Sequence, residues 1–106
     1  MIIAKSDPFT KEEIKKKNKA TLGALAMDLK RITLGLQRGS KIMAFRFTQE
    51  ALKRESEIDM QNVDPYVRNI LKNIKLMLSN MDEQESEDIL MYSILLQNYA
   101  RHKFST

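Results

Sequence analysis

Residues 22–36, LGALAMDLKRITLGL, decide how the rest of the chain folds. Large aliphatic side chains recur in this stretch at steps of three and four residues, at Leu22, Leu25, Leu29, Ile32 and Leu36. This spacing places them on one side of an α-helix, where they would face a core. At about 100° per residue, Met27 and Leu34 point to the opposite side of the same helix. The stretch therefore predicts a helix with two apolar sides.

The start of this helix is marked by Thr10 and Glu13. The two residues have the spacing of a capping box, in which each side chain bonds a backbone N–H of the other residue. Residues 7 and 8 are Asp-Pro, which disfavours helix before this point. Residues 1–9 are therefore expected to be an extended lead to one helical domain that spans residues 1–106.

The end of the helix is predicted at the pair Gly39-Ser40, because the apolar positions change phase there. Gly39 can supply the C-terminal turn and Ser40 the N-cap of a second helix over residues 40–57. The core-facing stripe of that second helix is expected at Ile42, Phe45, Gln49 and Leu52. The alternative is a single helix over residues 10–57 with a local distortion at the pair.

Two more helices are predicted in the second half of the chain. Asp64 and Pro65 have the residue types of an N-cap and a first helical position. The stripe that follows is Val67, Ile70, Leu71, Ile74, Met77, Leu78 and Met81. A fourth helix is expected to begin near Asp82. No segment alternates apolar and polar residues with a period of two, so no β-strand is expected. We therefore predict an all-α fold, a small antiparallel four-helix bundle. A long helical hairpin with two shorter helices is the alternative.

Composition and charge narrow the function. The chain has 106 residues, no cysteine and a net charge of +4, so disulfide scaffolds and cysteine-ligated zinc are excluded. The charge is unevenly divided, since residues 1–54 carry +8 and residues 55–106 carry −4. No signal peptide is evident, and no apolar stretch approaches the roughly 18 residues of a membrane span. We expect a cytoplasmic protein that does not enter membranes.

The second apolar sides predict a binding surface. Ile89, Tyr92, Leu95, Leu96 and Tyr99 share one side of the fourth helix, and Leu90, Met91 and Ile94 share the reverse side. A small bundle has one core, so a second apolar side needs cover from outside. We therefore expect an interface with a second copy of the chain or with a partner protein, formed by Met27, Leu34, Leu90, Met91 and Ile94. The competing interpretation is that these residues are buried in an irregular bundle.

The motifs and spacings typical of catalytic sites are missing. The single histidine, His102, lies near the C-terminal end of the fourth helix and lacks the Glu-x-x-His spacing of metal-binding bundles. No nucleophile motif or glycine-rich phosphate loop occurs. Asp28 lies within an apolar run, where a structural ion pair with Arg31 or Arg46 is the expected role. We predict a protein with no enzymatic activity, catalytic residues, metal, cofactor or small-molecule substrate.

The basic half of the chain offers an alternative function. Its cations could bind phosphate groups, which would make the chain a nucleic-acid-binding regulatory or accessory protein. Lysines outnumber arginines there, which argues against sequence-specific contacts with the bases. A solvated lysine-rich helix side is the simpler interpretation. The residues expected to contact an anionic partner are Lys15, Lys16, Lys19, Lys30, Arg38, Lys41 and Arg46.

Overall fold

A computed structural model describes residues 10–79 and 86–105 of the chain. The described residues form four α-helices and one short 3₁₀ helix. In chain order these are α1 (Lys11–Gln37), α2 (Lys41–Ser56), η2 (Met60–Asn62), α3 (Pro65–Ser79) and α4 (Ser86–Ser105). The all-α fold class is therefore confirmed. The predicted lead over residues 1–9, the predicted helix start near Asp82 and the predicted core residue Met81 lie outside the described residues.

The local sequence signals at the two ends of α1 act as expected. The Thr10 hydroxyl accepts from the backbone N–H of Glu13 at 3.1 Å, and the Glu13 carboxylate accepts from the N–H of Thr10 at 3.0 Å. At the other end Gly39 has a positive φ of 74°, which only glycine adopts readily. The Ser40 hydroxyl then caps α2 by accepting from Met43. The break between two helices is confirmed, and the single helix over residues 10–57 is wrong.

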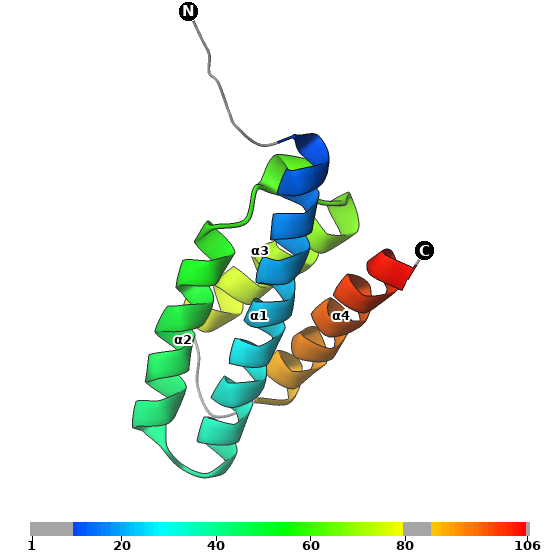
Figure 1. Cartoon of the computed structure of the whole chain (residues 1–106). Coiled ribbons are helices and arrows are strands. Elements are labelled where there is room, and N and C mark those ends of the chain that lie inside the picture. The colour runs from blue at the N-terminus through cyan, green and yellow to red at the C-terminus, as the bar shows by residue number, and fades with distance from the viewer. Residues whose placement is uncertain (1–9, 80–85, 106) are drawn as a thin grey trace, which may run out of the picture.

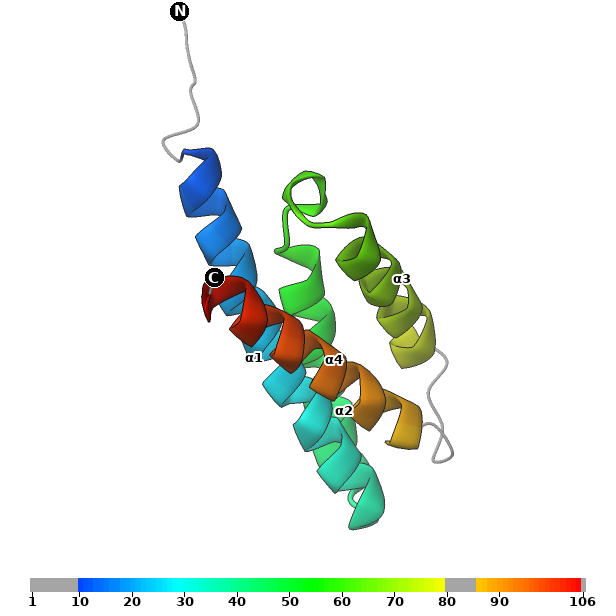
Figure 2. The ribbon, with the colours of Figure 1, turned by 90° about the vertical axis from the view of Figure 1, so that its right-hand side faces the viewer.

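The helices form a layer of three with the fourth lying across it. α1 lies between α2 and α4 and packs closely against both, whereas α3 contacts α2 and α4 at the far side of the core (Figure 1). Figure 2 shows α3 on one side of this three-helix layer. Neighbouring helices in the chain run in opposite directions, as expected for an antiparallel bundle. One face of the layer is therefore covered by α3, and the other face, which we call the outer face, is not.

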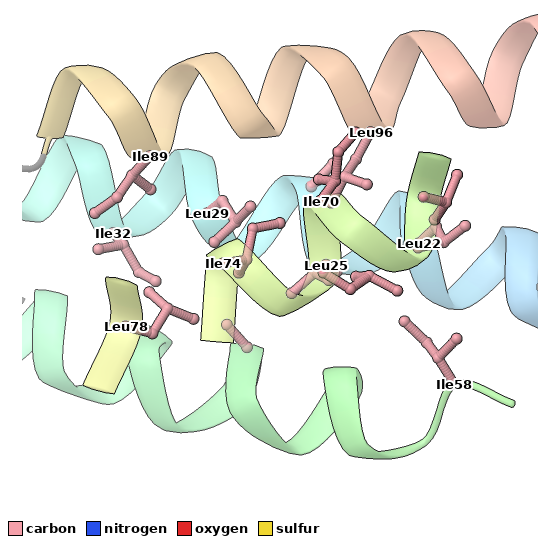
Figure 3. Packing of buried hydrophobic residues seen from close by; sticks show 14 of the residues in the cluster. Leu22, Leu25, Leu29, Ile32, Ile58, Ile70, Ile74, Leu78, Ile89 and Leu96 are labelled. Carbon is pink, nitrogen blue, oxygen red and sulfur yellow. The ribbon is translucent and has the colours of Figure 1, made fainter. Parts of the chain in front are cut away.

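The core lies between the layer and α3 (Figure 3). The predicted stripe of α1 faces it, since Leu22, Leu25, Leu29 and Ile32 are buried and Leu36 packs against them. α3 contributes the stripe that its sequence predicted, and its buried members are Val67, Ile70, Leu71, Ile74 and Leu78. Ile89 and Leu96 of α4 complete the cluster. Apolar periodicity thus located the core faces of these three helices correctly.

Of the predicted core stripe of α2, only Leu52 packs against the core, and the other three positions are wrong. Ile42 and Phe45 are 85% and 64% exposed, whereas the buried residues of α2 are Ala44, Thr48, Ala51 and Glu55. The reason is the close approach of α2 to α1 at Gly35, which favours the small side chains of Ala44, Thr48 and Ala51 between the two backbones. The buried Thr48 hydroxyl has a hydrogen-bond partner within the helix, because it donates to the Ala44 carbonyl at 2.7 Å. A prediction based on hydrophobicity therefore misses this surface of α2, where most of the residues in contact are small.

The two glycines within α1 give a test of this close approach. A Cβ atom added at Gly35 would lie 2.9 Å from the backbone nitrogen of Ala44, whereas a Cβ at Gly23 would meet nothing within 4 Å. Gly35→Ala should lower the free energy of unfolding by about 1–2 kcal/mol, because the clash exceeds the gain in helix propensity. Gly23→Ala should raise it by about 0.5–1 kcal/mol. Urea unfolding in dilute solution, followed by circular dichroism, measures both, and a Gly35→Ala variant as stable as the parent would contradict the close packing.

Candidate interaction surfaces

The outer face carries large apolar side chains that the fold leaves in water. Met27 and Leu34 of α1 are 42% and 39% exposed, and Met91 and Ile94 of α4 are each 46% exposed. Leu90 is half-buried. These five residues, the outer apolar patch, are the set that the sequence predicted for an interface. The structure leaves four of them exposed, so the interpretation that they fill an irregular core does not hold.

A buried hydrogen bond brings the two halves of this patch together. The Ser93 hydroxyl of α4 donates to the Ala26 carbonyl of α1 at 2.8 Å, with Ser93 and Ala26 both buried. The next residue along each helix is turned about 100° away from this contact. Because both helices turn the core stripe toward α3, Met27 and Ile94 lie level with each other on the outer side of the α1–α4 pair. The patch is thus one surface built on two antiparallel helices.

Asp28 of α1 binds α2, the other helix that packs closely against α1. This carboxylate is 1% exposed, and it accepts from Arg54 Nε at 2.6 Å and from Arg31 Nη1 at 3.4 Å. Arg31 also lies over the Phe47 ring, 5.4 Å from its centroid. The pairing with Arg31 was expected, but the partner on α2 is Arg54 instead of Arg46. Since Gly35 lies against Ala44, residue 28 of the antiparallel hairpin lies opposite about residue 51, within reach of position 54 and too far from 46.

The seven predicted anion-binding residues are spread over α1, α2 and the turn between them. Lys15, Lys16 and Lys19 share the N-terminal half of α1, whereas Arg38 follows its C-terminal end, about 35 Å from Lys15 along the helix axis. Lys30 is about 16 Å beyond Lys19. Lys41 and Arg46 lie on the first turns of α2. The binding of a nucleic-acid backbone by these residues stays a prediction.

The first three lysines instead surround a hollow of about 390 Å³, which we call the basic hollow. It lies between α1, the residues that precede α3, and α4. Leu22 and Val63 provide apolar lining, and Tyr99 contributes the α4 side. The residues that line it are Glu12, Lys15, Lys16, Asn18, Lys19, Leu22, Asn62, Val63, Asp64 and Tyr99.

Buried polar contacts fix the walls of the basic hollow. The Asn18 amide, 4% exposed, bonds both backbone groups of Asp59, donating to its carbonyl and accepting from its N–H, each at 3.0 Å. Asp59 in turn caps η2 by accepting from the N–H of Gln61. Sequence reasoning did not select Asn18, although a signal was present. Asn18 stands four residues before Leu22, on the core stripe, where a polar residue needs a buried partner.

Tyr99 closes the hollow from the α4 side. Its hydroxyl donates to the Asp64 carboxylate at 2.7 Å, which ties the end of α4 to the start of α3. Burial, together with this bond to a negative group, raises the pKa of Tyr99 to about 12. The phenol therefore stays protonated at neutral pH and keeps donating to Asp64.

Other kinds of site are not found in the described ranges, 10–79 and 86–105. No three histidine or acidic side chains gather there closely enough to hold a metal ion. No described helix combines the length and the apolar content needed to cross a membrane. The backbone of His102 lies in α4, as expected, but its side chain is outside the described part of the structure.

Comparison with known proteins gave no relative. No family model, no curated protein and no solved structure matches the chain. The surfaces described above are therefore the basis for inferring function.

The ion pair of Asp28 predicts a difference between two arginines of α2. Arg54→Met should destabilise the fold by about 2 kcal/mol, less than for a fully buried pair because water reaches part of the guanidinium. Arg46→Met removes the same charge from an exposed position and should change the free energy of unfolding by less than about 0.5 kcal/mol. Chemical unfolding of the two variants side by side makes the measurement. Equal changes in the free energy of unfolding of the two variants would contradict a stabilising role of the Asp28–Arg54 ion pair.

Proposed function

We propose that this chain is a non-enzymatic helical interaction module that associates with a second copy of itself through the outer apolar patch. The observation that carries the proposal is that α3 covers one face of the three-helix layer while Met27, Leu34, Met91 and Ile94 remain substantially exposed on the other. Apolar clusters of this kind on a folded protein mark places where other molecules bind.

The arrangement of the patch favours a second copy as the partner. Its apolar residues form two rows, one on α1 and one on α4, and these helices run antiparallel side by side (Figure 1). A half-turn about an axis that lies in the plane of the contact, between the two rows and parallel to the helices, turns the outer face of a second copy onto that of the first. Such a rotation packs α1 of one copy against α4 of the other, which is the isologous contact of a two-fold dimer.

The size of the patch predicts a weak dimer. Completing the burial of a half-exposed Met, Leu or Ile side chain contributes about 1 kcal/mol. Four such side chains on each copy give a gain on the order of 8 kcal/mol, against which stands the loss of translational and rotational freedom. With that loss at the low end of its range, about 4 kcal/mol, the net gain is about 4 kcal/mol, so we expect a dissociation constant on the order of 1 mM.

The test is the mass in solution as a function of concentration. Sedimentation equilibrium of the full chain should show a shift from monomer to dimer as concentration rises to about 1 mM. The double variant Met91→Lys/Ile94→Lys should stay monomeric over the same range, because two ammonium groups would have to be buried at the contact. Since the patch is apolar, dimerisation of the parent should change little with salt.

A matched control comes from α3. Tyr66 and Leu76 are 56% and 59% exposed on this helix, so Tyr66→Lys/Leu76→Lys makes the same change outside the patch. This variant should dimerise like the parent. A parent that remains monomeric at about 1 mM, or a control variant that loses the dimer equally, overturns the proposal.

A further inference from the structure

We propose that the basic hollow binds a small organic phosphate, a phosphomonoester carried on a body of roughly nucleoside size. This site is separate from the outer apolar patch and does not depend on dimerisation. Its volume of about 390 Å³ falls within the range of pockets that hold small molecules.

The charges around the hollow favour an anion. Lys15 and Lys19 are four residues apart and Lys16 and Lys19 three apart, so the side chains are neighbours on the surface of α1. Within the described ranges Lys15 and Lys16 form no ion pair. Like charges at these spacings destabilise a helix. A phosphomonoester, which carries close to two negative charges at neutral pH, would relieve this repulsion.

The acidic residues that line the hollow reduce its positive charge without cancelling it. Asp64 accepts the hydroxyl hydrogen of Tyr99, so one of its oxygens is engaged within the protein. The other carboxylate, Glu12, is exposed on the first turn of α1. The residues that line the hollow carry three ammonium groups and two carboxylates, a net charge of +1, and Lys16 also interacts with the Glu13 carboxylate outside the lining.

The rest of the lining suits the organic part of the ligand. Val63 provides apolar surface, the Tyr99 ring forms one wall, and the buried Leu22 lies beneath them. Asn62 adds an amide, whose Nδ2 donates to Asp59 Oδ2 at 2.9 Å and whose oxygen is an acceptor for a hydroxyl group. Because Asn18 and Tyr99 fix the walls through hydrogen bonds, the hollow exists before any ligand arrives and little ordering is needed on binding.

Binding is measured by titrating the full-length protein with AMP and with inorganic phosphate, using calorimetry and amide chemical shifts. AMP should bind in a saturable way, at least about 10-fold tighter than inorganic phosphate, because only AMP fills the apolar lining. The shifts should cluster at residues 15–22, 62–64 and 99. Absence of saturable binding at about 10 mM AMP, or equal affinity for AMP and phosphate, overturns the proposal.

Two double variants separate a site from general attraction between charges. Lys15→Gln/Lys16→Gln should weaken AMP binding by about 10-fold or more, since two charge-assisted contacts are lost. Lys41→Gln/Arg46→Gln makes the same change in net charge on α2, away from the hollow, and should weaken binding less than about 2-fold. Equal losses in the two variants would overturn the proposal.

The source of the phosphate is decided by a third titration. A short 5′-phosphorylated oligonucleotide is compared with the same strand lacking the phosphate. Tighter binding of the phosphorylated strand than of AMP identifies the end of a nucleic acid as the source, and tighter binding of AMP identifies a free metabolite. Binding of the unphosphorylated strand as tightly as the phosphorylated one would show that a terminal phosphate is not recognised.

Discussion

The close contact of α1 with two neighbours at once is the constraint on which the structure depends. At Gly35 the backbone of α2 comes so near that even a methyl group has no room, and at Ala26 the hydroxyl of Ser93 bonds directly to the α1 backbone. Small residues at these points let three helices lie side by side. Large residues on the α3 side of the same helix then fill the wider space of the core.

A layer of this kind has two faces, and the described helices cover only one. α3 is the single helix outside the layer, and its five buried aliphatic residues all belong to one core. The sequence of α1 and α4 nevertheless carries apolar residues on the outer side as well. Exposed apolar residues are therefore a consequence of the helix count together with the two-sided pattern of α1. The two-sided apolar pattern of residues 22–36 therefore leads to an exposed apolar patch on the outer face, whatever binds there.

The sequence predicted those features that depend on periodicity and on local capping. The core stripes of α1 and α3, the capping box at Thr10 and the break at Gly39 all follow from interactions within a few residues. Apart from Leu52, the core side of α2 did not follow, because it is set by the distance to α1 and not by hydrophobicity. Arg54 was missed for a related reason, since its pairing with Asp28 requires the register of the hairpin. The outer apolar patch was found because it is a periodic feature, whereas the basic hollow joins three separate segments that no local pattern connects.

Buried polar groups fix the offsets between the helices, which the packing of apolar residues alone does not determine. Leucine and isoleucine stripes are compatible with several offsets between helices, because one aliphatic side chain can replace another at little expense. Asp28, Asn18 and Ser93 are each buried and each need one particular partner on another element. A shift of α2 or α4 along α1 would leave one of these groups without its hydrogen bond, at a penalty of about 1–3 kcal/mol or more for the carboxylate. The three contacts therefore fix the helix offsets, and with them the positions of the outer apolar patch and the basic hollow.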